Sequence, residues 1–132
     1  MVTRDDLESF LIRMDLNFDE VDEGMYLVHP ANDGPPVVVH HTPPLLVVRL
    51  KVWDLPKDRD LGKLYIKLLE WNVDDVVHGA YGIEEGYLIL TDTLELETLD
   101  FPEIQASLES MQMAASSHMD QIKALATTGV GG

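Results

Sequence analysis

Histidine is the first residue type to weigh in this sequence, because imidazole moves protons near neutral pH and binds metal ions. The chain has five, His29, His40, His41, His78 and His118. His40 and His41 are adjacent, so in a strand they point to opposite faces and cannot easily share one ion. A site built from His29, His40 and His78 would need their strands to adjoin. Solvent-facing or hydrogen-bonded imidazoles are the favoured interpretation, and we predict no metal site.

Carboxylates are the second candidate for chemistry. Asp19, Glu20, Asp22 and Glu23 form a cluster, but they lack the spacing and the closing glutamate of a calcium loop. A solvated turn is the favoured interpretation. No serine lies in a nucleophile elbow, no glycine-rich phosphate loop is present, and the chain has no cysteine. The sequence therefore predicts no catalytic residue and no cofactor, and we expect a protein that is not an enzyme.

Composition narrows the class of partner. The chain has 132 residues, with 9 Lys and Arg against 24 Asp and Glu and a formal net charge of −15. Such a surface repels nucleic-acid phosphates and anionic membranes. No signal peptide or membrane-spanning run is visible, so we expect a cytoplasmic protein. Its length fits one domain over residues 1–127, followed by a flexible tail over residues 128–132.

Charge is unevenly placed along the chain. Six of the basic residues lie between Arg49 and Lys67, and Lys123 is the only one from Leu68 onward. A solvated surface with one neutralising patch is the simpler interpretation. The alternative is that the acidic surface and the basic segment help to orient a partner.

Hydrophobic periodicity gives the element order. Thr3 and Asp6 form a variant capping box before a short amphipathic helix. Residues 18–22 alternate only weakly and stay unassigned. Asp58 or Asp60 is the expected cap of the second helix, and Asp100 that of a long last helix. The expected strands are 25–29, 37–42 and 45–53 before the second helix, and 76–83 and 87–96 after it. This predicts an α+β fold with a twisted antiparallel sheet in the order α-β-β-β-α-β-β-α.

The second helix carries more apolar surface than one face requires. Leu61, Leu64, Tyr65, Leu68 and Leu69 form one stripe, and Ile66 and Trp71 lie off it. A helix that is apolar beyond one face usually packs against two surfaces. One of these would be its own sheet, and the other could be a second subunit.

Residues 64–111, LYIKLLEWNVDDVVHGAYGIEEGYLILTDTLELETLDFPEIQASLESM, carry a family resemblance. Leu68, Leu69 and Asn72 look like the "LL-x-x-N" feature of the class I type III secretion chaperones (the Tir-chaperone or CesT-like family) and the related YbjN-like proteins. The hairpin from Gly79 to Leu90 resembles the strands that follow that feature. The element order and the acidic composition are also similar.

The resemblance implies a small cytoplasmic homodimer that binds an extended segment of a secreted client through apolar patches and strand addition. By resemblance, the dimer interface would use the second helix and the adjacent strand, namely Leu64, Leu68, Trp71, Val77 and Tyr81. The client-binding candidates lie on the first helix and the early strands, namely Leu7, Leu11, Met25, Leu27, Val37 and Val39.

Three functional hypotheses remain open at this point. The first is a dimeric chaperone-like protein that binds an extended client. The second is a YbjN-like regulatory or scaffold protein without a secreted client. The third is a small enzyme or ligand-binding domain that uses the histidines and carboxylates, which metal analysis of the purified protein would test.

Overall fold

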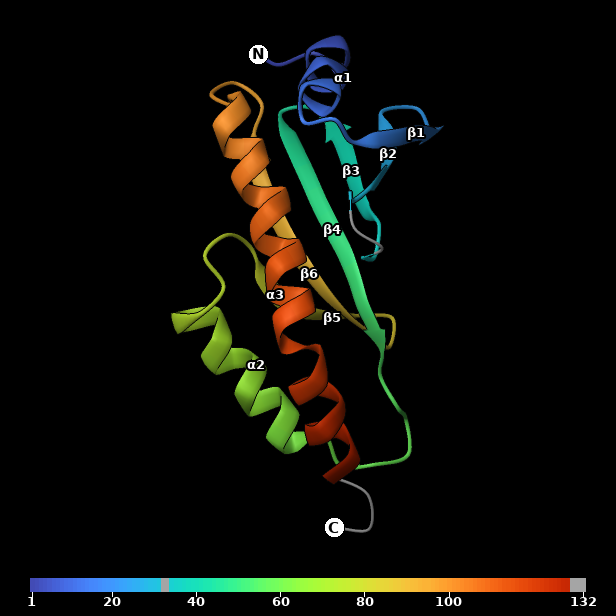
Figure 1. Cartoon of the computed structure of the whole chain (residues 1–132), viewed down its shortest axis with the longest axis vertical. Coiled ribbons are helices and arrows are strands. Elements are labelled where there is room, and N and C mark those ends of the chain that lie inside the picture. Colours follow the sequence, from blue (N-terminus) through green and yellow to red (C-terminus); the bar gives the residue numbers. More distant parts are fainter. Residues whose placement is uncertain (32–33, 129–132) are drawn as a thin grey trace.

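The computed structural model describes residues 1–31 and 34–128, which form three helices and one six-stranded antiparallel sheet (Figure 1). In chain order the elements are α1 (Arg4–Arg13), β1 (Asn17–Asp22), β2 (Met25–His29), β3 (Val37–Thr42), β4 (Leu45–Asp54), α2 (Gly62–Asp74), β5 (Ala80–Glu84), β6 (Tyr87–Glu95) and α3 (Phe101–Thr128). The strand order in the sheet is β1-β2-β3-β4-β6-β5. The predicted α+β class with an antiparallel sheet is confirmed.

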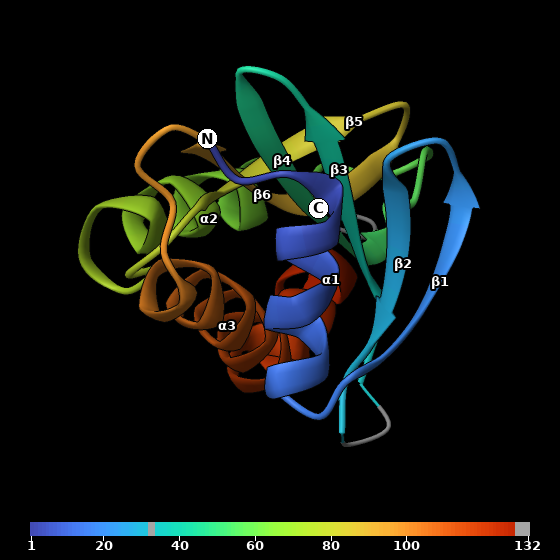
Figure 2. The ribbon, with the colours of Figure 1, turned by 90° about the horizontal axis from the view of Figure 1, so that it is seen from above.

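The molecule has two layers. All three helices lie on one side of the curved sheet, and no helix of the described residues lies on the other side (Figure 2). Alternate strand residues therefore enter the core, as in β4, where Leu46, Val48 and Leu50 are fully buried while Val47 and Arg49 face outward. This is the period-two alternation that the sequence shows in this strand.

One strand is added to the predicted order. Residues 17–22 form β1, so four strands rather than three precede the second helix. The weak alternation has a structural cause, because the pairing of β1 with β2 shifts register between Glu20 and Asp22. In addition, only Phe18 of this edge strand is even half-buried, so its sequence carries almost no burial pattern.

The first helix closes one end of the core. Thr3 accepts from the Asp6 N–H and Asp6 accepts from the Thr3 N–H, which confirms the predicted capping box. Leu7 and Leu11 are fully buried in the shared core. Complete burial of one such side chain contributes about 2 kcal/mol, so these two residues hold α1 on the sheet.

The predicted cap of the second helix is wrong. Leu61 occupies the N-cap position and makes no capping hydrogen bond through its side chain. Asp60 accepts from the Gly62 N–H at 2.8 Å, so the predicted residue still satisfies one of the free N–H groups near the start of the helix.

The strand after α2 begins later than expected. It starts at Ala80, not at Val76, because residues 75–79 form a loop that ends at Gly79 with φ +89°. A Cβ at Gly79 would lie 2.8 Å from the Thr91 carbonyl oxygen, so the backbone of the loop approaches β6 closely at this glycine.

The last helix begins as predicted, with Asp100 accepting from the Glu103 N–H at 2.9 Å. It runs through Thr128, so the first residue of the expected tail is helical. Residues 129–132 of that tail, and residues 32–33 of the loop between β2 and β3, lie outside the described residues. None of the helices described here is long and apolar enough to cross a membrane.

Alanine substitutions at two glycines distinguish the cost of backbone strain from the cost of a steric clash. Gly79→Ala and Gly86→Ala both place Cβ on a positive-φ backbone, but only the former meets another backbone atom, since nothing lies within 4 Å at Gly86. We expect Gly86→Ala to cost about 1 kcal/mol of unfolding free energy and Gly79→Ala to cost about 3 kcal/mol. Urea unfolding of both variants measures the difference, and equal losses would contradict the close approach at Gly79.

Candidate functional site

The outer side of α2 is a stripe of apolar side chains that no other described element covers. Buried residues of the helix are Leu64, Leu68 and Trp71. The exposed stripe, which we call the α2 face, consists of Tyr65, Ile66, Leu69 and Val73. Leu69 is 66% exposed and Val73 is 88% exposed. The predicted apolar excess of this helix is therefore present, although Trp71 lies on the buried side and Leu69 on the exposed one.

A shallow apolar groove continues the α2 face onto β5. It has a volume of about 240 Å³, and Tyr65, Leu69 and Ile83 are among its lining residues. Ile83 is exposed. The helix face and the strand therefore offer one continuous apolar surface.

Asn72 fastens α2 to the edge of the sheet beneath this groove. Its Oδ1 accepts from the Tyr81 N–H at 2.7 Å, and its Nδ2 donates to the Tyr81 carbonyl at 3.3 Å. β5 is a terminal strand, so these outward backbone groups have no strand partner. A side-chain amide supplies both a donor and an acceptor and matches them. The asparagine of the "LL-x-x-N" pattern thus has a defined role that the sequence did not show.

The predicted interface residues take two kinds of position. Leu64, Leu68, Trp71 and Tyr81 are buried within the chain, whereas Val77 is exposed on the loop before β5. The four buried residues pack beneath the α2 face and support it. The interface assignment itself stays a prediction, and the exposed neighbours on α2 are the residues that a second chain would touch.

The uncovered side of the sheet forms a second surface, which we call the open sheet face. Cross-strand pairs place Leu27 beside Val38, Val38 beside Arg49, and Lys51 beside Ile89. Four aliphatic side chains near the centre of this face are half-buried, namely Leu27, Val38, Val47 and Ile89. A small hollow of about 160 Å³ lies on this face between Met25, Val38, His40, Val47 and Arg49.

Basic residues of the predicted patch also lie on this face. Arg49 donates to Glu84 at 2.8 Å, and the Lys51 ammonium lies 3.6 Å from the centre of the Tyr87 ring. Lys51 also pairs with Asp54 at 3.2 Å. The face is therefore apolar with paired charges, in contrast to the acidic remainder of the chain.

The predicted client-binding residues divide between the core and this face. Leu7, Leu11, Val37 and Val39 are fully buried. Met25 and Leu27 are half-buried on the open sheet face. The assignment to a client stays a prediction, and Met25 and Leu27 are the members of the set that a second molecule could reach without rearrangement of the core.

β1 forms the edge of the sheet opposite to β5, and this edge is open. β1 pairs only with β2 among the described strands. Asp19, Glu20, Val21 and Asp22 are exposed along it. Unpaired N–H and C=O groups on such an edge form a template for another extended chain. The β1 edge is thus open, whereas the β5 edge is engaged at Tyr81 by Asn72.

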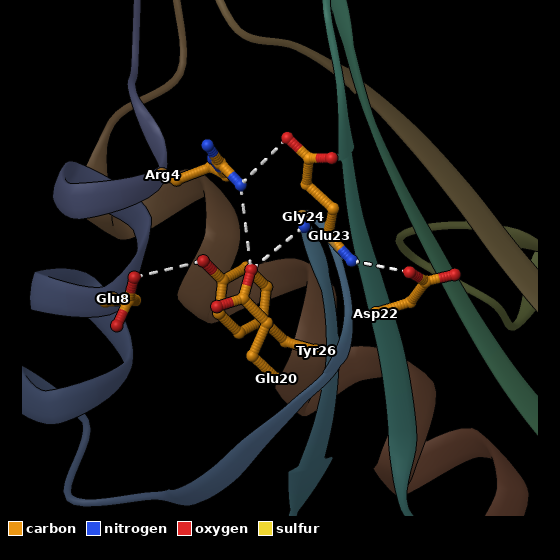
Figure 3. A network of polar contacts seen from close by, with 7 residues as sticks. All are labelled: Arg4, Glu8, Glu20, Asp22, Glu23, Gly24 and Tyr26. Atoms are coloured by element: carbon orange, nitrogen blue, oxygen red, sulfur yellow. Dashed lines mark hydrogen bonds and ion pairs between the residues drawn. The ribbon is translucent and has the colours of Figure 1, made fainter.

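A polar network sets the position of that edge (Figure 3). Arg4 Nη1 lies 3.7 Å from carboxylate oxygens of both Glu20 and Glu23. Glu20 also accepts from the Gly24 N–H at 3.0 Å. The predicted acidic turn is therefore partly strand and partly a set of contacts that bind the β1–β2 turn to α1.

The buried Tyr26 makes the deeper link in this network. Its hydroxyl donates to Glu8 Oε2 at 3.0 Å, which joins β2 to α1 (Figure 3). Burial first, and then the Glu8 hydrogen bond, raise the pKa of Tyr26 to about 12. The neutral phenol is thus strongly favoured in the folded chain.

The histidines do not converge. Among the described residues, no group of three His, Cys, Asp or Glu side chains is placed to hold a metal ion. His29 lies 3.3 Å from Asp19, and His41 Nε2 lies 2.9 Å from the Val2 carbonyl oxygen. Nothing in the sequence indicated the role of His118. This residue is buried between α2, β5 and α3 and contacts Asp75 and Tyr81.

The comparisons with known proteins agree on one fold. The family model CesT_Tir_1 matches residues 2–128. No curated protein matches the chain. A chain of the heterodimeric ExoU–SpcU complex, from the type III secretion system of Pseudomonas aeruginosa, superposes with a TM-score of 0.68 at 16% identity, covering 84% of this chain and 93% of that one.

Two further solved structures share the architecture. A chain of the HopA1–SchA chaperone–effector complex has a TM-score of 0.62 at 16% identity, covering 84% of this chain and 88% of that one. YbjN from E. coli, a candidate transcription regulator, has a TM-score of 0.68 at 12% identity, covering 90% and 92%. At these identities the likeness concerns the fold.

The Tyr26–Glu8 link gives a prediction for alkaline pH. Because the pKa of Tyr26 rises on folding to about 12, its stabilisation is complete below an unfolded pKa of about 10 and is lost as pH rises through the folded value. We expect the unfolding free energy of Tyr26→Phe to fall less between those two pH values than that of the wild type. Burial also raises the pKa of Tyr81, so the variant keeps part of the decline. Urea unfolding across this range measures it, and identical slopes would contradict the prediction.

Proposed function

Because this chain belongs to the CesT_Tir_1 family, we propose that it is a dimeric, non-enzymatic chaperone-like protein that binds an extended segment of a client protein. The observation that carries the proposal is the pairing of an uncovered, partly apolar sheet face with an open β1 edge. The proposed client is an unfolded stretch of another protein, with a secreted effector as the leading case. A cytoplasmic location goes with this role, since a client held for export is bound before it leaves.

Client binding would use two kinds of contact. The β1 edge offers backbone groups to an added strand, and the apolar positions of the open sheet face offer contacts to its alternate side chains. The exposed acids of β1 favour a client segment with basic residues at the corresponding positions. An acidic body keeps such apolar surface soluble through its net charge.

Dimerisation would use the α2 face and the groove beside β5. This surface is continuous, and the backbone edge beneath it is engaged by Asn72 at Tyr81. It therefore suits side-chain packing between two copies better than strand addition. The proposed contacts are the exposed residues Tyr65, Leu69, Val73 and Ile83.

A second candidate is a regulatory or scaffold protein that has no secreted client. The likeness to YbjN favours it, with the same TM-score of 0.68 as the ExoU–SpcU chain. Direct contact with DNA is disfavoured by the net charge of −15. The two candidates differ in one observable, namely whether an extended segment of a partner binds the open sheet face.

A matched pair of variants tests the dimer. Leu69 and Ile12 are each 66% exposed, on α2 and on α1. Leu69→Asp introduces a charge that would be buried in the proposed interface, at a cost of several kcal/mol. We expect a folded monomer by light scattering, whereas Ile12→Asp keeps the mass of the wild type. A monomeric wild type, or an unchanged dimer in Leu69→Asp, would remove the α2 face from the proposal.

A second pair of variants tests client binding. The tagged protein is purified from its native cells, the retained protein is identified, and its N-terminal segment is titrated onto the purified chain. We expect Val38→Asp, on the open sheet face, to lose the segment while remaining folded. Thr98→Asp adds the same charge at an exposed position outside the sheet, between β6 and α3, and should retain it.

Hydrogen exchange provides an independent readout of the same complex. A bound strand should slow amide exchange in residues 17–22, because outward N–H groups of β1 gain partners. Retention of a folded domain without protection of β1 would instead favour the scaffold candidate. Absence of any retained protein would leave the chaperone-like role without support and would decide against it.

A further inference from the structure

A hollow separate from both of these surfaces lies between the loop of residues 75–79 and α3. Its volume is about 490 Å³. Val77 on the loop and Met113 on α3 both line it, and they are 80% and 69% exposed. The His78 N–H donates to Ser110 Oγ at 3.1 Å, so the loop is fastened to the helix beside the hollow. Two large apolar side chains are thus held in the open at one preformed site.

Asp75 presents a carboxylate at this site in a fixed orientation. One of its oxygens is hydrogen-bonded to His118 Nε2. The His118 ring is buried and stacks on Trp71, with ring centres 3.8 Å apart and an angle of 4° between the planes. His118 Nδ1 lies 2.6 Å from the Tyr81 hydroxyl. Three elements therefore position Asp75, whose side chain remains 55% exposed.

The hollow is negatively charged, so it favours a cationic group of a ligand. Asp75 and Glu109 are its acidic residues, and no Lys or Arg lines it. Glu109 makes no ion pair within the described part of the chain. From Leu68 onward the sequence contains a single basic residue, Lys123. Among the described residues Glu109 is therefore unpaired, and the partner of Asp75 is the His118 imidazole. Carboxylates between apolar walls suit the methylene stem and the charged head of an arginine or lysine side chain.

We propose that the hollow docks a partner protein through an arginine or lysine side chain flanked by apolar residues. The cationic head binds Glu109, Asp75 adds negative charge to the same hollow, and the neighbouring apolar side chains pack on Val77 and Met113. Methionine suits this contact because its flexible side chain adapts to the shape of a partner. Arginine is favoured over lysine, since its planar fork can form two parallel hydrogen bonds with a carboxylate.

This docking site is separate from the surfaces of the proposed function, apart from Val77, which the family resemblance also assigns to the dimer interface. It uses neither the open sheet face nor the exposed stripe of α2, so a client and this partner could be bound at the same time. The hollow is lined by loop and α3 residues, and α3 lies on the helical side of the sheet (Figure 2).

The test uses the full chain and a capped peptide, Ala-Leu-Arg-Leu-Ala, with a matched peptide that carries neutral citrulline instead of arginine. We expect saturable NMR shifts in residues 75–79 and in α3 near Glu109. Because a hydrogen bond to a charged group contributes about 1.5–3 kcal/mol, citrulline should weaken binding about tenfold or more. Glu109→Gln should do the same, while Glu103→Gln on the same helix, outside the hollow, should bind as the wild type does.

Several results would overturn the proposal. Equal affinity for the citrulline peptide, or an unchanged affinity in Glu109→Gln, would show that the carboxylates do not select the ligand. Shifts confined to the α2 face or the open sheet face would place the peptide elsewhere. Equal binding by free spermidine would make the site one for small amines. Dissociation of a dimer by Met113→Asp would identify a second copy of the chain as the occupant.

Discussion

The two hydrogen bonds between Asn72 and the backbone of Tyr81 are the contact on which the arrangement of surfaces depends. They join α2 to a terminal strand and satisfy edge groups that would otherwise attract another chain. Since α2 is held there, its buried side completes the core and its opposite side must face outward. One side-chain amide therefore engages this edge of the sheet and, together with the burial of Leu64, Leu68 and Trp71, fixes where the apolar excess of α2 appears.

The opposite edge of the sheet, formed by β1, is not covered by a side chain of this kind in the described part of the chain. β1 is acidic and exposed, and its position depends on charge contacts of Arg4 and on the buried hydroxyl of Tyr26. Charged residues on an edge strand discourage nonspecific pairing, yet they leave the backbone groups accessible. An edge of this kind can be selective, because a basic extended segment is attracted while an acidic one is repelled. The asymmetry between the two edges separates the surface proposed for a second copy from the one proposed for a client.

Buried polar groups fix the relation of α2, β5 and α3. Trp71, Asp75, Tyr81 and His118 come from all three elements or their ends and form one contiguous set of stacking and hydrogen-bonding contacts. Satisfied networks of this kind specify one arrangement of a core, since any other arrangement leaves polar atoms unpaired. The same set aims Asp75 toward solvent, so the contacts that lock the helices also prepare a charged surface.

The sequence by itself determined the element order apart from β1, the caps at Thr3 and Asp100 and the apolar excess of α2. These features depend on local backbone preferences and on periodicity along one element, which are legible in a single chain. Only the tertiary structure decided which apolar residues are accessible. Leu7 and Val37 are core residues while Leu27 is reachable, because periodicity assigns residues to faces without saying which face is covered. The same limit hid the contact between His118 and Asp75, since residues 43 apart in the chain meet only when three packed elements bring them together.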